Sequence, residues 1–280
     1  MTEIVGAIGV PHTPAFPVMV ERDAPLAGEL KRLYGALAER LDRLAPEVIV
    51  YFTSDHYNTF FESSLPIFAI GVAESSSGPA DYADLAQYTV PIAAGLADRI
   101  QERLVRGGFD IGKSQEFSVD HPITIPLHFM RPAMDVPIVP IFINAFVRPL
   151  PSAARCLALG RAVGEAVRAD RQYARAVVLA TGSFSLEVGG PRMRETSHIG
   201  VPAPEWVGRI LELLGAGDVE ALAAEASEEQ IEAAGNAGGE ILDWIAMLAA
   251  LGPAAPEFLE AQLDFGHAYA AWSAGAALAS

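Results

Sequence analysis

Residues 46–58 read PEVIVYFTSDHYN, and this stretch decides what kind of fold the chain adopts. Its first seven residues are mostly apolar and rich in β-branched and aromatic side chains, which is typical of a strand buried on both faces. Asp55 and His56 follow directly. In sheets of parallel strands, chemistry gathers in the loops beyond the strand ends. The stretch therefore predicts a buried strand that carries a histidine to a functional edge of a sheet.

The rest of the chain alternates between strand patterns and helix patterns, which favours an α/β fold. Strands are predicted at 3–10, 66–72, 136–144 and 174–183. Helices are predicted at 26–44, where leucines recur every three or four residues, and at 91–107 and 152–169. From about residue 204 onward the pattern is mostly helical. No break in composition marks a boundary, so we expect residues 1–280 to form a single domain with a central mixed sheet flanked by helices.

Composition excludes several classes of function. The formal net charge of −16 argues against nucleic acid or an anionic membrane as a partner, since both demand a basic face. The single cysteine, Cys156, excludes an intrachain disulfide framework and a thiolate-rich metal site. The N-terminus does not resemble a signal peptide, and no run approaches the ~20 apolar residues of a membrane span. A cytoplasmic protein is expected.

Two histidines occupy equivalent positions in the predicted fold. His12 and His56 each follow a predicted strand, and the two strands flank one predicted helix. They are therefore expected at the same edge of the sheet, where two imidazoles and a carboxylate would suit a divalent transition metal. A spacing of 44 residues is no motif, and capping of backbone groups at the strand ends is the alternative.

Glu240 is a candidate for that carboxylate. It lies in AAGNAGGEILDWIAML (233–248), on what reads as the inward stripe of a helix, and two glycines before it allow another backbone to approach closely. A buried carboxylate is costly unless it is paired or bound to a metal. The alternative is a glutamate at a helix N-terminus, favoured by the helix dipole.

Four segments, in chain order, resemble one known family. They are DHYNTFF (55–61), SVDHPITIPL (118–127), VPIVPIFINAFVRPLPSAARCLALGRAV (136–163) and GGEILDW (238–244). Together they are similar to the class III (LigB-type) extradiol ring-cleavage dioxygenases, which include the catalytic subunits of protocatechuate 4,5-dioxygenases and the 2,3-dihydroxyphenylpropionate dioxygenases. The similarity runs from His12 to about Leu251.

The resemblance implies a site, a cofactor and a reaction. The metal ligands of the family fall on His12, His56 and Glu240, which would hold one non-haem Fe(II) at the strand ends. A catalytic histidine of the family falls on His121, although capping of a following helix beside Pro122 is the alternative for this residue. The implied reaction is cleavage of a catechol-like or related hydroxy-aromatic ring with O2. A metal-dependent enzyme acting on a non-catechol and a catalytically silent subunit are the alternatives.

The same resemblance implies the partners. A small aromatic substrate and O2 are expected at the site. The chain is expected to form a homo-oligomer, and a separate small partner subunit is an alternative arrangement in this family.

One position departs from the family pattern. The family carries a second catalytic histidine in the loop that reads GSFSLEVGG (182–190) here, and its position falls on Leu186. Leucine cannot move a proton. Either Glu187 or His198 supplies the base, or the substrate needs none, or the chain is not catalytic.

The remaining candidates are supporting groups. Asp55, Tyr57 and Asn58 adjoin His56 and are candidates for orienting a ligating imidazole or contacting substrate. Ser185 either bonds a ring hydroxyl or shapes its turn. His267, beyond the resemblance, is expected at the surface or in an interface.

Overall fold

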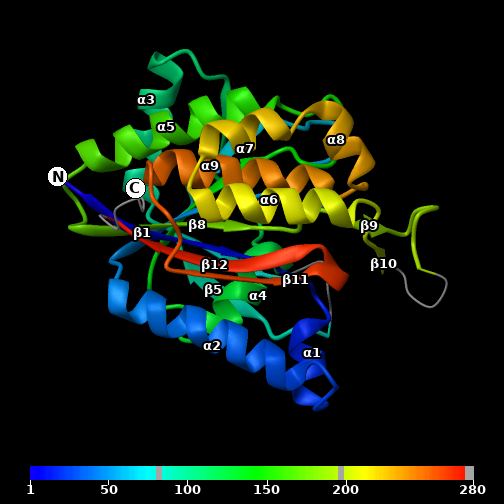
Figure 1. Ribbon diagram of the computed structural model, residues 1–280. Helices are drawn as coiled ribbons and strands as arrows, with labels where there is room; N and C mark the ends of the chain where they lie inside the picture. Colours follow the sequence, from blue (N-terminus) through cyan, green and yellow to red (C-terminus); the bar gives the residue numbers. More distant parts are fainter. Residues whose placement is uncertain (80–83, 195–198, 275–280) are drawn as a thin grey trace.

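The computed structural model of the chain describes residues 1–79, 84–194 and 199–274. One eight-stranded sheet runs through it (Figure 1). In spatial order its strands are β11 (Phe258–Gln262), β12 (His267–Ser273), β1 (Glu3–Val10), β8 (Arg175–Thr181), β2 (Val48–Thr53), β7 (Ile138–Ile143), β3 (Phe68–Gly71) and β6 (Ile111–Ser114). The central pairs β1–β8, β8–β2 and β2–β7 are parallel, whereas β1–β12, β11–β12 and β3–β7 are antiparallel. The predicted α/β class with a mixed sheet is confirmed.

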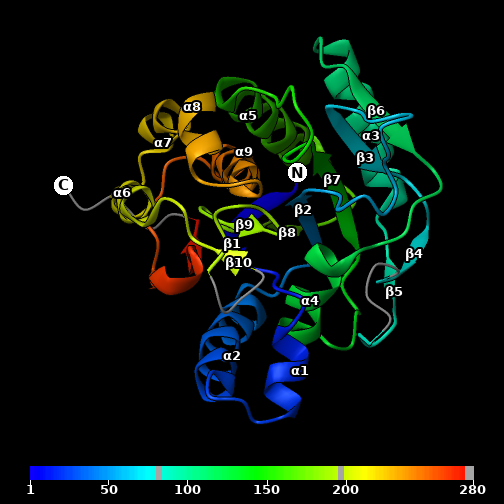
Figure 2. The same ribbon diagram turned by 90° about the vertical axis from the view of Figure 1, so that its right-hand side faces the viewer.

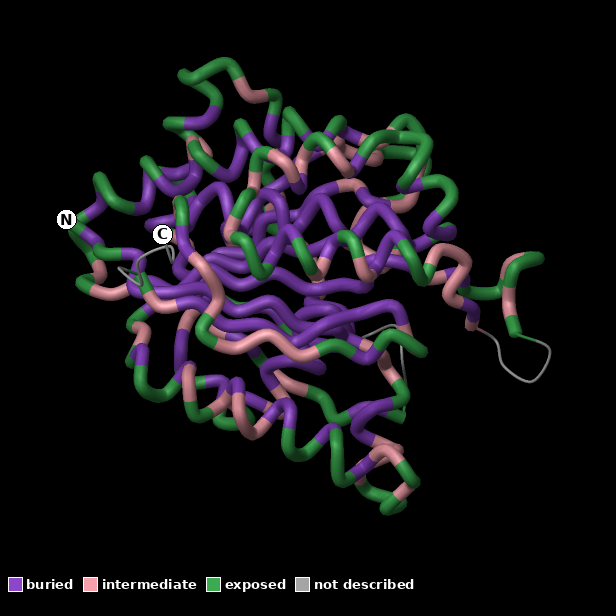
Figure 3. Tube along the Cα trace, viewed as in Figure 1, coloured by how far each residue is buried: buried purple, intermediate pink, exposed green. Residues whose placement is uncertain are grey.

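Helices cover both faces of this sheet (Figure 2). One face carries α1 (Phe16–Glu21), α2 (Ala27–Leu44) and α4 (His121–Met130). The other carries α3 (Ala94–Arg106), α5 (Ala153–Ala169), α6 (Pro204–Ala216), α7 (Val219–Glu225), α8 (Glu228–Ala233) and α9 (Ile241–Leu251). The central strands are consequently buried on both sides, as Figure 3 shows, which explains their continuous apolar sequences. The helices predicted at 26–44, 91–107 and 152–169 are α2, α3 and α5.

The smaller elements lie at the periphery. Two short antiparallel pairs join β4 (Ser75–Gly78) to β5 (Tyr88–Pro91) and β9 (Glu187–Val188) to β10 (Ile199–Gly200). Two 3₁₀ turns, η1 (Gly238–Glu240) and η2 (Leu263–Phe265), precede α9 and β12. Within the described ranges, no helix is long and apolar enough to cross a membrane.

The mostly helical pattern predicted from residue 204 onward is right for α6 to α9 and wrong for the strands β11 and β12. Strands β11 and β12 form a hairpin, and β12 pairs antiparallel with β1 along the register Gly6–Ser273 to Gly9–Ala270. This segment is rich in alanine, the best helix former. It becomes a strand because β1 offers an edge whose backbone groups need partners, and such tertiary contacts override local propensity.

The order of the strands decides where the polar residues meet. Strand β8 lies between β1 and β2, and all three run parallel, so their carboxyl ends lie at one edge of the sheet. His12 follows β1, Gly182 follows β8 and His56 follows β2. The two histidines therefore follow strands that are separated by β8, and Gly182 lies between them at this edge.

Candidate metal centre

Four side chains converge at this edge from separate elements. They are His12 after β1, His56 after β2, His121 at the start of α4 and Glu240 at the end of η1. Each histidine offers a ring nitrogen, and the three nitrogens lie within 4.8 Å of one another, so this group could hold a metal ion. The ring centroid of His56 is 5.0 Å from that of His12 and 4.5 Å from that of His121.

The carboxylate of Glu240 lies against two of these rings. Its Oε1 is 3.0 Å from Nε2 of His12 and 3.4 Å from Nε2 of His56. Its Oε2 accepts a hydrogen bond of 2.7 Å from the backbone N–H of Ser183. Glu240 is 1% exposed. Burial by itself raises the pKa of this carboxyl, but His12 and His56 outweigh burial and hold the pKa well below its usual range. The group is therefore ionised.

Two glycines allow the carboxylate to reach this position. Gly182 has φ +130°, and a Cβ on it would lie 2.4 Å from Cβ of Glu240. A Cβ on Gly239 would lie 2.1 Å from the carbonyl oxygen of Ala145. Both contacts are too short for any side chain, so the two turns around Glu240 require glycine. The close approach predicted for the glycines before Glu240 is present.

The donor set fits a divalent metal ion. Ligand bonds from imidazole nitrogen and carboxylate oxygen are about 2.0–2.2 Å long, so two ligands at right angles lie about 3 Å apart. The distances from Oε1 of Glu240 to the nitrogens of His12 and His56 match this spacing. Oε1 is also buried without a hydrogen bond, which is costly for a carboxylate oxygen unless something else satisfies it. His121 supplies a further nitrogen at the same place.

Asp120 belongs to the site, although its sequence pattern did not predict it. It is buried, and its Oδ2 accepts a hydrogen bond of 3.0 Å from the backbone N–H of His56. The same oxygen lies 3.8 Å from Nδ1 of His56. Because Asp120 directly precedes α4, it ties the loop of His56 to the helix that begins at His121. An aspartate before a helix start reads as an N-cap, but its side chain makes no capping bond here.

The loop after β2 is held by the predicted supporting residues. The Asp55 carboxylate accepts hydrogen bonds from the backbone N–H groups of Asn58, Thr59 and Phe60 at 3.1, 2.9 and 3.0 Å. Burial raises the pKa of Asp55, although these three bonds oppose the increase. The side chain of Asn58 donates to the carbonyl of Ser118 at 2.7 Å. Asp55 and Asn58 therefore shape the loop that presents His56.

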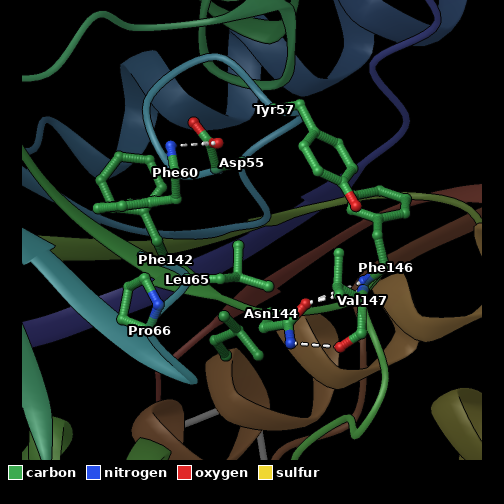
Figure 4. A pocket seen from close by; sticks show the side chains of 10 residues that line it. Asp55, Tyr57, Phe60, Leu65, Pro66, Phe142, Asn144, Phe146 and Val147 are labelled. Atoms are coloured by element: carbon green, nitrogen blue, oxygen red, sulfur yellow. Dashed lines mark hydrogen bonds between the residues drawn. The ribbon is translucent and has the colours of Figure 1, made fainter. Parts of the chain in front are cut away.

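Tyr57 has a different setting. It is 46% exposed, and its φ of +55° is unusual for a bulky residue. Tyr57 lines a small pocket together with Asp55 and Phe146 (Figure 4). The ring of Phe146 lies 4.5 Å from that of His56, so this pocket borders the histidine cluster.

Ser185 and Leu186 both make hydrogen bonds that anchor their loop to other segments. The hydroxyl of Ser185 donates to the carbonyl of Ala234 at 2.9 Å and accepts from the backbone N–H of Ala203 at 3.0 Å. The carbonyl of Leu186 accepts from the N–H of Ala237 at 3.0 Å. The contacts with Ala234 and Ala237 bind this loop to the segment that leads into Glu240.

Glu187 is engaged in an ion pair. Its Oε2 accepts from the guanidinium of Arg192 at 2.9 Å and from the backbone N–H of Asn236 at 3.0 Å. The carboxylate is buried and its contacts hold the loop together. His198, the other residue considered as a replacement base, lies outside the described residues.

His267 was expected at the surface or in an interface, and this expectation is wrong. It begins β12 and is 1% exposed. The error follows from the helical prediction for this segment. A helix here would have left the His267 side chain outside the sheet, whereas strand β12 belongs to it.

A family model described as the catalytic LigB subunit of aromatic ring-opening dioxygenase matches residues 6–276. The chain belongs to the LigB family. This membership confirms the resemblance drawn from the four sequence segments. It also places the chain among ring-cleavage oxidoreductases and agrees with the group of histidines that could hold a metal.

Curated relatives in this family are similar over most of their length. A 2,3-dihydroxyphenylpropionate/2,3-dihydroxicinnamic acid 1,2-dioxygenase from Klebsiella pneumoniae is 29% identical over 279 residues, covering 86% of this chain and 87% of the relative. A protein of the same name from Photorhabdus laumondii is 29% identical over 305 residues, covering 94% of each chain.

A solved structure shares the fold. An uncharacterized protein from Escherichia coli K12 superposes with a TM-score of 0.63 at 18% identity, covering 97% of this chain and 100% of that one. The α/β architecture of this LigB chain is therefore found in a structure determined independently.

The close approach of Gly182 to Glu240 yields a first prediction. Gly182→Ala should weaken binding of a divalent metal ion about 10-fold or more, because the added Cβ displaces the carboxylate. Gly189→Ala is the matched control: it strains a backbone of φ +65°, but its Cβ meets nothing within 4 Å, so metal affinity should stay at the wild-type value. Anaerobic Fe(II) titration measures both, and equal affinities for the two variants would contradict the geometry.

Proposed function

We propose that this LigB protein is an extradiol-type dioxygenase that uses Fe(II), held by His12, His56 and Glu240, to open the ring of a catechol-like compound with O2. The observation that carries the proposal is the buried Oε1 of Glu240, which faces two imidazoles and has no hydrogen bond. Two histidines and one carboxylate on an open face are typical of non-haem Fe(II) oxygenases. The named substrates of the relatives carry the adjacent hydroxyls of a catechol.

An Fe(II) ion held by His12, His56 and Glu240 would supply Lewis-acid chemistry toward the substrate hydroxyls. The residues around the ion would orient the substrate and exclude water from the site. His12 and Glu240 are buried, whereas the His56 side chain is 22% exposed and marks the side open to substrate. Phe146 packs its ring against His56 and offers an apolar wall on that side.

His121 is proposed to move the protons. Its ring lies 4.5 Å from that of His56 and 5.3 Å from that of His12, and it is buried. From this position its imidazole would accept a proton from a substrate hydroxyl beside the ligands and return it later. Such acid–base assistance contributes about 10²–10⁴-fold to the rate.

Leu186 stands where the family has a second catalytic histidine, and this absence of a base limits which substrates the site can ionise. Glu187 is held by Arg192 and Asn236, so it is poorly placed to act as the missing base. We therefore propose a substrate whose hydroxyl ionises without a second base, with Leu186 as an apolar part of the wall. The same departure favours, as the second candidate, metal-dependent cleavage of a non-catechol on this scaffold. The homo-oligomer, its alternative with a separate small partner subunit, and the cytoplasmic location stay predictions from the sequence.

Substitution of the ligands separates binding from turnover. Alanine at His12, His56 or Glu240 should abolish stoichiometric Fe(II) binding, because each change removes one of the three proposed ligand atoms. His121→Phe should keep Fe(II), because His12, His56 and Glu240 remain, and should lower the turnover number by about 10²–10⁴-fold. Anaerobic Fe(II) titration and oxygen consumption measure the two effects. Full iron occupancy in Glu240→Ala would show that the ligand assignment is wrong.

Restoring the family histidine tests the explanation of Leu186. Leu186→His should bind Fe(II) unchanged and raise turnover of simple catechols by up to about 100-fold, because it adds a general base. Val188→His, which adds an imidazole at an exposed position two residues on, should leave turnover unaltered. Equal rates for Leu186→His and wild type, with iron bound in both, would favour the non-catechol alternative.

A further inference from the structure

His267 is a buried imidazole close to the candidate metal centre that the proposed chemistry does not use. Aromatic rings surround it: Phe265 stacks at 5.7 Å, and Phe16 and Tyr269 lie edge-on at 5.9 Å each. An apolar ring would suit these neighbours, and burying a polar group is costly unless it is hydrogen-bonded. The side chain therefore calls for an explanation beyond packing.

Both nitrogens of His267 have partners. Nε2 lies 3.0 Å from Oε1 of Gln262, and this oxygen also accepts from the hydroxyl of Tyr269 at 3.1 Å. In this orientation of the Gln262 amide its oxygen accepts from the ring, and Nε2 carries the proton. Nδ1 is then an acceptor, and it faces the hydroxyl of Ser183 at 3.5 Å.

Ser183 is also the residue that holds the carboxylate of Glu240. Its backbone N–H donates to Oε2 at 2.7 Å. The following backbone docks on the turn that carries His267, because the N–H groups of Phe184 and Ser185 both donate to the carbonyl of Gly266, at 2.7 and 3.2 Å. A chain of contacts thus runs from Gln262 through the imidazole and Ser183 to the carboxylate.

Protonation would break this chain, and the surroundings oppose it. Burial, reinforced by the nearby His12, lowers the pKa of His267 to about 3. A neutral ring keeps one nitrogen as a hydrogen-bond acceptor. It is suited to fixing a neighbour and unsuited to carrying protons.

We infer that His267 is a positioning residue for the metal ligand Glu240: it fixes Ser183, whose amide holds Oε2 and leaves Oε1 alone to face the imidazoles of His12 and His56. This inference rests on the proposed metal site. It assigns a function to the C-terminal hairpin, which closes the sheet edge of β1 and also holds the turn behind the site.

Co(II) titration with the visible absorption of the bound ion tests the inference. His267→Phe keeps an aromatic ring and Ser183→Ala keeps the backbone N–H, but each removes the contact between the two side chains. Each variant should weaken Co(II) binding about 10-fold and alter the absorption bands, because the carboxylate is no longer held in one orientation. The double variant should be no weaker than the weaker single variant, because both changes remove the same interaction.

Two further variants complete the design. His267→Gln retains an acceptor and should recover most of the affinity. His128→Phe makes the same substitution at a half-buried histidine that bonds Tyr88 instead, and it should bind as the wild type does. If His267→Phe fails to fold, the Co(II) affinities of Ser183→Ala and His267→Gln still test whether the contact between His267 and Ser183 supports metal binding.

The outcomes distinguish the two proposals. Wild-type affinity and spectrum in both Ser183→Ala and His267→Phe, or losses that add in the double variant, would overturn the role of His267 while leaving the metal site intact. A wild-type protein that binds no Co(II), or a Glu240→Ala variant that binds it fully, would instead overturn the proposed site.

Discussion

The structure depends on where one buried carboxylate is placed. Glu240 has almost no contact with solvent, so its charge must be balanced inside the protein. Two imidazoles face one of its oxygens and a backbone amide holds the other. These partners come from the ends of three neighbouring parallel strands, β1, β8 and β2, and this strand order brings them together. The sheet topology and the site are therefore one arrangement.

Contacts between distant segments keep that arrangement rigid. Asp120 binds the backbone of His56 and directly precedes His121, so one residue fixes the loop after β2 relative to α4. The loop that carries Leu186 is fastened to the segment before Glu240. The site thus rests on loops that are tied to each other as well as to the sheet. Such support is needed where ligand geometry must be held within narrow limits.

The sequence predicted the parts of the site that local pattern reveals. His12 and His56 each follow an apolar strand, and Glu240 stands between two glycines and the apolar helix α9, so their residue types and positions were informative. The roles of Asp120 and His267 were not predictable in this way, because they arise from contacts with residues far away in the chain. Their neighbours are known only once β8, β12 and the loop after β2 are placed. The alanine-rich strand β12 shows the same limit: its local preference is helical, and pairing with β1 decides its conformation.

Oxygen uptake by the anaerobically Fe(II)-loaded protein tests the central claim most directly. The substrates would be a panel of catechols, gallates, aminophenols and hydroxypyridines, with the ring-opened product followed by its absorbance. The account predicts consumption of one O2 for each ring opened with at least one of these compounds, and none without iron. Iron bound at full stoichiometry with no uptake from any member of the panel would contradict the assignment as a ring-opening dioxygenase.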